Sequence, residues 1–212
     1  MRLLDFHTHL YNIERYRDDS TVIAVRSLMP DEETDDRSDL FTVGIHPMEP
    51  DHTVEELEEL EQLAQRVGSQ LIGIGECGWD GRSPLSMERQ TELVRAQIRL
   101  ADRLGLPIIY HVVGGWHLLL SERKAHPEGI WIVHGFRGKP ALLRQLEEAD
   151  IRVSLHPKYH WEAVPTLPFF LETDDSDTPL SEVYERAART QSISKEELSE
   201  RLLAQLRSSI RL

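Results

Sequence analysis

The chain has 212 residues, 40% of them hydrophobic, which is enough to bury one substantial core. Its formal net charge of −13 disfavours long-range attraction to nucleic acid and other polyanions unless a local basic patch provides it. The single cysteine, Cys77, excludes an intramolecular disulfide, and the start MRLLDFHTHL lacks the pattern of an export or membrane signal. We therefore expect one domain over residues 1–212, in a soluble, cytoplasmic protein without membrane contact.

Short apolar runs rich in β-forming residues alternate with helix-period stretches along the chain. There are eight such runs, at residues 3–6, 21–25, 41–45, 71–75, 107–110, 130–133, 151–155 and 168–171. Strands that alternate with helices pair in parallel, and eight of them indicate a closed barrel. The predicted fold is therefore α/β, a TIM-type (β/α)8 barrel.

Apolar positions at three- and four-residue spacing predict helices between these strands. They occur in residues 54–67, 87–104, 142–146 and 192–210. Thr53 is placed as the N-cap of the first helix, and Ser194 with Glu197 has the capping-box spacing at the start of the last. Three connections are too short or too polar for full-length helices, so we expect a short barrel with trimmed outer helices; they are residues 11–20, 30–40 and 156–167.

Histidines and carboxylates follow several of the apolar runs directly. They are His7, His9, Glu76, His111, His134 and Asp174. Imidazole and carboxylate together suit Zn, Mn, Fe or Mg. Because parallel strands of a barrel deliver their carboxyl ends to one mouth, the six residues predict a site for one or two divalent ions there.

The first three of these residues also have ordinary structural explanations. His7 and His9 alternate across Thr8, so both side chains would face the barrel interior, but an isolated His-x-His is common by chance. Glu76 follows the glycine-containing run LIGIG, and a buried Glu in that place can equally be a structural salt-bridge partner. The context of a buried strand favours the metal site for His7 and His9, and the presence of the histidines favours it for Glu76.

The other three residues have structural alternatives as well. His111 and His134 each come one residue after an apolar strand, where a core histidine bonded to a backbone carbonyl is the usual explanation for either alone. Their occurrence in successive strands favours the metal site. Asp174 lies in LETDDSD and can instead make a turn or cap the next helix.

Two more histidines follow strands and precede a proline. His46 and His156 are therefore expected to line the mouth of the barrel as substrate contacts.

The order of the motifs HTHL, VGIHP, IGECGWD, LPIIYH, VHGF and LETD resembles the TatD family of metal-dependent hydrolases, relatives of the amidohydrolases, over essentially the whole chain. The resemblance implies a metal-dependent hydrolase with a TIM-type barrel, in a family whose better-known members are deoxyribonucleases. It also implies that His7, His9 and Asp174 hold one metal and that His111 and His134 hold a second. Glu76 would bridge the two metals or be among the residues that contact a metal directly, and His46 matches a family motif without being a ligand.

The chain departs from the family pattern where substrate contacts are expected. Val113 stands where the family usually has an arginine, and Arg137 replaces a serine. After LETD the chain runs directly into a predicted helix, without the usual proline and long basic loop. These changes remove expected phosphate contacts, so the metal chemistry transfers better than the DNA substrate does.

The leading functional prediction is metal-dependent phosphodiester hydrolysis, on DNA ends or on a small or short phosphoester. Asp174 would be a ligand and the proton acceptor for water, and Glu76 would set the metal spacing. Arg137 would bind a substrate phosphate or carboxylate with its planar fork; the alternative is a surface salt bridge with Glu147 or Glu148.

Two alternatives remain open at this point. The same metal centre, with Mg, Mn or Zn, could act on a small phosphoester, an amide or a lactone, which the missing basic loop favours. The chain could also be a metal-binding scaffold without catalysis, although six retained ligands argue against this. The oligomeric state is open.

Overall fold

The computed structural model describes residues 1–34, 38–49, 54–161 and 163–209. The chain divides into two compact units, which we describe separately. Unit 1 comprises Met1–Arg26, Asp35–Leu40 and His134–Leu212, and unit 2 comprises Ser27–Thr34 and Phe41–Val133. The single domain expected over residues 1–212 remains a prediction.

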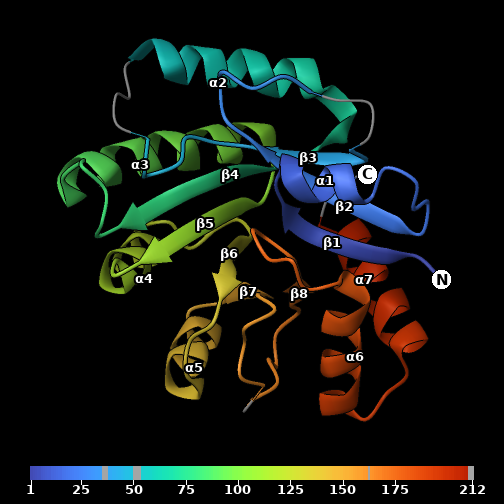
Figure 1. Cartoon of the computed structure of the whole chain (residues 1–212). Coiled ribbons are helices and arrows are strands. Elements are labelled where there is room, and N and C mark those ends of the chain that lie inside the picture. The colour runs from blue at the N-terminus through green and yellow to red at the C-terminus, as the bar shows by residue number, and fades with distance from the viewer. Residues whose placement is uncertain (35–37, 50–53, 162, 210–212) are drawn as a thin grey trace. The chain divides into compact units, whose positions relative to one another are not determined.

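Eight strands form one sheet whose neighbours follow chain order, as labelled in Figure 1. They are β1 (Leu3–Thr8), β2 (Val22–Leu28), β3 (Leu40–Val43), β4 (Leu71–Asp80), β5 (Ile108–Val113), β6 (Trp131–Phe136), β7 (Ile151–Leu155) and β8 (Phe170–Leu171). The pairs β1–β2, β3–β4, β4–β5, β5–β6 and β7–β8 are parallel. A parallel bridge between Thr8 and Asp174 joins the end of β1 to the segment after β8. This strand order is that of a (β/α)8 barrel, so the predicted fold class is confirmed.

Unit 1 contains α1 (Leu10–Arg15), α5 (Pro140–Glu148), α6 (Leu180–Gln191) and α7 (Lys195–Ser209). Helices α6 and α7 lie side by side (Figure 1). The Tyr184 hydroxyl of α6 accepts from the Leu4 N–H and donates to the Leu4 carbonyl, both at 3.0 Å. Phe6 and Phe170 stack with ring centroids 3.9 Å apart. The Tyr184 hydroxyl and the Phe6–Phe170 stack thus hold β1, which carries His7 near its end, against α6 and β8.

Unit 2 contains α2 (Val54–Val67), the short 3-10 helix η1 (Gly68–Gln70), α3 (Met87–Leu104) and α4 (Trp116–Ala125). Helix α3 begins after Ser86, whose hydroxyl accepts from the Arg89 N–H at 3.3 Å, and ends at Gly105 in the left-handed conformation. The aromatic rings of Trp79, Tyr110 and Trp131 lie against one another in its core.

Two glycines let β4 approach β5 closely. Gly75 and Gly78 have φ of +141° and +144°, which L side chains rarely adopt. A Cβ at Gly75 would lie 2.3 Å from the Ile109 carbonyl oxygen, and one at Gly78 would lie 2.0 Å from that of His111. The backbone of β4 therefore occupies space that a side chain would need, which brings Glu76 close to β5.

The predicted helices are confirmed as α2, α3, α5 and α7, and the Glu197 N–H donates to the Ser194 hydroxyl at 3.0 Å as the capping box predicts. Thr53 lies outside the described residues. Helix α4 was not predicted, because Leu118–Leu120 are consecutive and show no helical stripe. The trimmed connections are confirmed for the described residues: α1 has six residues, and the described parts of 30–40 and 156–167 contain no helix.

Among the described residues, every helix is too short or too polar to cross a bilayer.

Candidate metal centre

Unit 1 brings together three of the six predicted ligands. His7 lies on β1, His134 lies on β6, and Asp174 follows β8. Each offers one ligand atom within 4.8 Å of the others, and the two imidazole centroids are 4.0 Å apart. Both histidines are buried. Two imidazoles and a carboxylate at this spacing match the donor set and size of a divalent-metal site.

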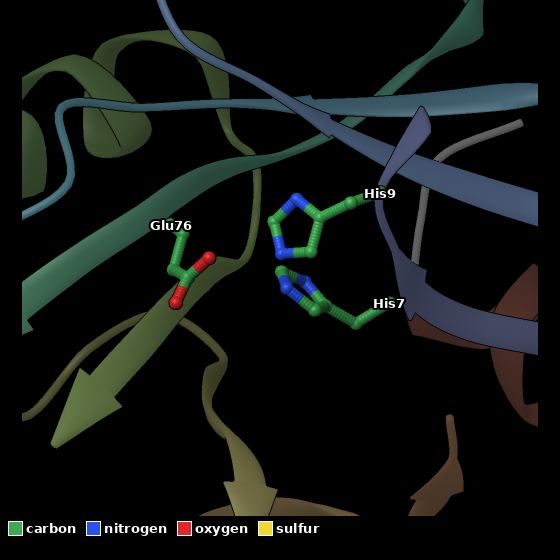
Figure 2. Close-up of side chains that lie close together, drawn as sticks. All are labelled: His7, His9 and Glu76. Carbon is green, nitrogen blue, oxygen red and sulfur yellow. The ribbon is translucent and has the colours of Figure 1, made fainter. Parts of the chain in front are cut away.

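His9 lies beside this group, at the rim. Its Nε2 is 3.5 Å from Oδ1 of Asp174, and 45% of its side chain is exposed. Figure 2 shows the rings of His7 and His9 edge to face, with centroids 5.2 Å apart. The structure thus brings the fourth predicted ligand of unit 1 to the same carboxylate.

Unit 2 brings the remaining two predicted ligands into direct contact. Oε1 of Glu76, on β4, lies 2.9 Å from Nδ1 of His111, on β5. Nε2 of His46, just after β3, lies 3.2 Å from the same oxygen. Joint binding of one metal by Glu76 and His111 fits this spacing, since two ligands of one ion lie about 3 Å apart when each is about 2 Å from it.

Asp80 holds the other side of the His111 ring. Its Oδ2 lies 3.0 Å from His111 Nε2. The Arg82 guanidinium donates to both Asp80 oxygens, at 2.9 and 2.6 Å, and lowers the pKa of Asp80 well below its usual range. An ionised carboxylate only accepts, so Asp80 favours a proton on Nε2 of His111, which would leave the Nδ1 lone pair for a metal shared with Glu76. Asp80 was not among the predicted site residues.

Backbone amides decide the tautomers of the two His-Pro histidines. The Met48 N–H donates to Nδ1 of His46 at 3.2 Å, and the Lys158 N–H donates to Nδ1 of His156 at 3.0 Å. Nδ1 is therefore unprotonated, and the neutral ring carries its proton on Nε2. A protonated nitrogen has no lone pair for a metal. Although both rings lie near carboxylates in metal-like groups, they act as N–H donors rather than as ligands.

Glu172 stands behind His134 as a buried carboxylate. It is fully buried, and its Oε1 accepts the Gly135 N–H at 2.6 Å. The same oxygen lies 3.6 Å from Nδ1 of His134. At this distance Glu172 forms no hydrogen bond with Nδ1, and its charge would act on a ligating His134 only through space. The sequence analysis passed over Glu172, whose only signal was its place directly after the strand, in LETDD.

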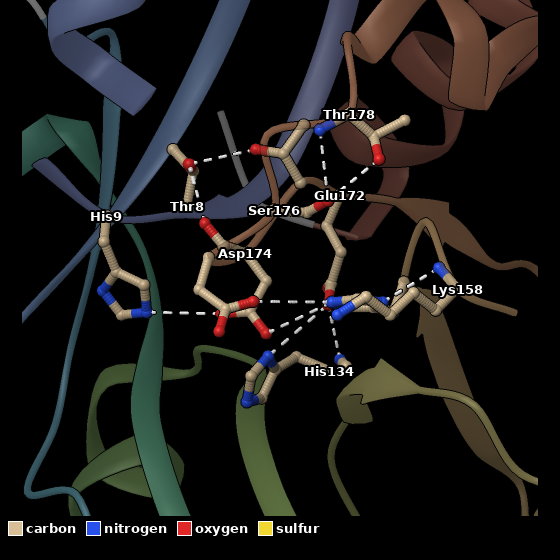
Figure 3. A network of polar contacts seen from close by, with 12 residues as sticks. Thr8, His9, His134, Lys158, Glu172, Asp174, Ser176 and Thr178 are labelled. Atoms are coloured by element: carbon tan, nitrogen blue, oxygen red, sulfur yellow. Dashed lines mark hydrogen bonds and ion pairs between the residues drawn. The ribbon is translucent and has the colours of Figure 1, made fainter. Parts of the chain in front are cut away.

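A hydrogen-bonded network holds the segment of Asp174. The backbone and hydroxyl of Thr173 donate to the Asp5 carboxylate at 2.8 and 2.6 Å. Asn12 Nδ2 donates to the Asp174 carbonyl at 3.0 Å, and Arg15 fixes the amide by donating to Asn12 Oδ1 at 2.9 Å. Burial raises the pKa of Asp5 to about 7 although its hydrogen bonds act against this. These contacts support Asp174 in a left-handed conformation, φ +54°; Figure 3 shows neighbouring contacts around it.

Arg137 is exposed at the end of β6. The alternative of a salt bridge with Glu147 is wrong, because Oε1 of Glu147 instead accepts from the Thr166 backbone and, at 2.8 Å, from its hydroxyl. Within the described part of the chain, Arg137 forms no ion pair with Glu148 or with any other carboxylate. Its guanidinium is therefore available to bind an anion.

A sequence model of TatD-related DNases matches residues 32–207, most of the chain. The chain belongs to this TatD-related family. A metal-dependent hydrolase of Escherichia coli, YjjV, named as uncharacterized, is 30% identical over 153 residues, covering 66% of this chain and 59% of that protein. YabD of Bacillus subtilis, with the same description, is 29% identical over 150 residues, covering 62% and 56%. The matches thus span less than two thirds of these curated TatD relatives.

Solved structures show the same fold. The crystal structure of E. coli YjjV, a TatD homologue, superposes with a TM-score of 0.79 at 21% identity, covering 100% of this chain and 98% of that one. A TatD-family hydrolase of Entamoeba histolytica superposes with a TM-score of 0.69 at 14% identity, covering 98% and 83%. The TatD barrel is therefore the fold of this chain.

Proposed function

We propose that the protein is a metal-dependent hydrolase that cleaves phosphodiester bonds, on DNA ends or on short phosphoesters. One observation carries this proposal: each unit brings histidine and carboxylate ligand atoms together within or just after its strands, and each has a buried carboxylate near a candidate ligand histidine. The family description, TatD-related DNase, favours the phosphodiester, and the names of the two curated relatives support a metal-dependent hydrolase.

All six predicted residues serve as ligands in this proposal, for one or two ions of Mg, Mn or Zn; they are His7, His9, Glu76, His111, His134 and Asp174. The donor chemistry fits, because the ligand atoms within each unit are closely spaced and the Asp80 carboxylate holds the His111 ring. His46 and His156 stay outside the ligand set for the tautomeric reason given above.

The residues then divide the chemistry. A divalent cation held by these ligands would lower the pKa of a water and offset the charge of the phosphoester. The Asp174 carboxylate, held through its backbone by Asn12, accepts the proton of the attacking water. The contact between Glu76 and His111 sets the distance between their two ligand atoms. The Nε2–H of His46 donates to the Glu76 carboxylate. Arg137 offers its guanidinium to an anionic part of the substrate.

The experiment that tests this proposal is a substrate panel with defined metals. The protein is stripped of metal, reloaded with Mg, Mn or Zn, analysed for bound metal, and assayed on a generic phosphodiester, a phosphomonoester, an amide and a lactone. We expect metal-dependent turnover of the phosphodiester. Turnover confined to the monoester, the amide or the lactone would assign the same centre to a different bond. Stoichiometric metal with no turnover on any substrate would leave a metal-binding scaffold.

The shortness of the segment after Asp174 favours a short substrate. Only five residues separate Asp174 from the start of α6 at Leu180, and the exposed end of β5 carries Val113. Neither segment offers the several cations that grip a long phosphate backbone. Short phosphoesters are therefore the preferred substrates within the proposed class.

A further inference from the structure

Three basic residues, Arg137, His156 and Lys158, follow the ends of β6 and β7 in unit 1. The His156 N–H donates to the Phe136 carbonyl at 3.3 Å, which places Arg137, the next residue, beside His156. Lys158 is joined to the same histidine through its backbone N–H. Arg137 and Lys158 thus lie on either side of His156 along the backbone, and the His156 ring lies beside Asp174.

The His156 side chain directs its Nε2 toward the carboxylates of Asp174 and Asp175. The residue is fully buried, and its Nε2 has no hydrogen-bond partner among the described residues. The carboxylate oxygens that it faces, Asp175 Oδ1 at 3.6 Å and Asp174 Oδ2 at 3.9 Å, are beyond hydrogen-bonding distance. Since Nδ1 accepts from Lys158, Nε2 carries the proton. A buried N–H without an acceptor is costly, so this donor is suited to an acceptor that binds from outside the chain.

The two cationic side chains, those of Arg137 and Lys158, are also available to bind an anion. Arg137 and Lys158 are exposed, and neither has an ion-pair partner in the described part of a chain that contains 37 acidic and 24 basic residues. Two cations and one aimed N–H together form a donor set for an oxyanion.

We propose that Arg137, Lys158 and the Nε2–H of His156 form a subsite for a phosphate group of the substrate, beside the metal ligand Asp174. This inference rests on the proposed function and narrows it to phosphoesters that carry an additional, terminal phosphate. A tetrahedral dianion accepts more hydrogen bonds from several directions than a planar carboxylate does, and the three donors come from separate positions. Asp174 and Asp175 oppose an anion here, so a bound divalent cation should strengthen phosphate binding.

The first test measures binding of inorganic phosphate by NMR of the His156 side-chain nitrogens, on the full chain with and without Mg²⁺. We expect saturable binding that Mg²⁺ tightens and that Arg137→Ala weakens about tenfold or more, the loss of one charge-assisted pair. Arg144→Ala is the matched control, because Arg144 is an exposed arginine on α5. The absence of phosphate binding, equal effects of the two variants, or acetate binding as tight as phosphate binding overturns the proposal.

Two His156 variants distinguish the role of the Nε2–H donor from the role of the Nδ1 acceptor that holds the Lys158 N–H. His156→Asn keeps an acceptor for the Lys158 N–H but lacks the distal donor, whereas His156→Gln keeps a distal N–H. We expect phosphate binding to be lost in the first variant and largely kept in the second, with melting temperatures checked for both. If both variants keep phosphate binding, the assignment of Nε2–H as a donor is wrong.

The last test compares a dinucleotide with a terminal phosphate to the same dinucleotide without one. The wild type should have the higher kcat/KM on the phosphorylated form, and Arg137→Ala should remove most of that preference. Equal kcat/KM values in the wild type overturn the substrate assignment. If the protein hydrolyses nothing but still binds phosphate through Arg137, the proposed function fails and the subsite stands.

Discussion

Nε2 of His111 lies 3.0 Å from Oδ2 of Asp80, so a carboxylate that is itself held by Arg82 selects which ring nitrogen faces Glu76. The first prediction follows from this relationship. Asp80→Asn presents an amide that can donate to Nε2, which moves the ring proton to Nδ1 and removes the lone pair offered to a metal. Metal affinity should fall about 10- to 100-fold, as for other partners of ligating histidines.

Calorimetric metal titration and NMR of the His111 nitrogens in the metal-free protein measure the two effects separately. Val113→Ala, at an exposed position on the same strand, is the control. A variant that binds metal as tightly as the wild type, with Nε2 still protonated, would contradict the tautomer assignment.

His134→Ala should remove a metal ligand while the fold persists. The substitution opens polar space near Asp174 and Glu172 rather than a cavity in the apolar core. Metal-dependent activity should fall by orders of magnitude, while circular dichroism and the melting temperature change little. His126→Ala, at the end of α4, is the control and should keep full activity. Unchanged turnover of His134→Ala at saturating metal would rule out His134 as an essential ligand.

Asn12→Ala should cost both stability and metal affinity. The side chain is buried and donates to the Asp174 carbonyl and, at 3.1 Å, to the Thr173 hydroxyl. Its loss leaves two buried acceptors without that donor, which costs about 1–3 kcal/mol. Urea unfolding measures the stability, and metal titration measures the effect on Asp174. Stability and affinity that both equal the wild-type values would show that the network around Asp174 does not hold it.

Asp5 should make the metal-free protein less stable as the pH rises. Its pKa is raised from 3.8 to about 7 in the folded state, so between these values the folded chain holds a proton that the unfolded chain has lost. The contribution of this proton is fully present below about pH 4 and is lost as the pH approaches the folded-state pKa of about 7. Asp5→Asn mimics the protonated form and should remove this dependence. Urea unfolding at pH 5 and pH 8 tests this, and equal pH dependence in both proteins would contradict it.

Catalysis should depend only weakly on salt. A chain of net charge −13 with Val113 at the exposed end of β5 should engage few backbone phosphates, so log(kcat/KM) should change little with log[salt]. Short oligonucleotides should be turned over nearly as well as long single strands. A steep salt slope with a strong preference for the long strand would instead restore a general nuclease role.

The strands and the candidate ligands could be predicted because a local sequence pattern specifies each of them. Alternation of apolar runs and helices marks eight strands, and the residue after a run is a histidine or carboxylate in the places that matter. The prediction ended the fourth strand at residue 75, with the residues CGWD after Glu76 as a tight exit from it. The structure continues β4 to Asp80 with all ten residues buried, since Glu76 and Asp80 both face His111.

The supporting residues could not be predicted in this way. Asp80 and Glu172 matter through contacts with rings on other strands, and no spacing in the sequence specifies those distances. The tautomers of His46 and His156 likewise depend on one backbone N–H each, which only the folded turn places within reach of Nδ1. Residue type therefore identifies the ligands, and three-dimensional packing identifies what orients them.

The close approach of β4 to β5 at Gly75 and Gly78 has a consequence for how this protein can change. A side chain at either position would collide with the β5 backbone and push Glu76 away from His111. The loops that carry Arg137 and Lys158 have no such restriction, because those side chains are exposed. New substrate preferences can therefore be selected by varying the loops, while the distance between Glu76 and His111, and with it the metal chemistry, stays fixed by the absence of two methyl groups.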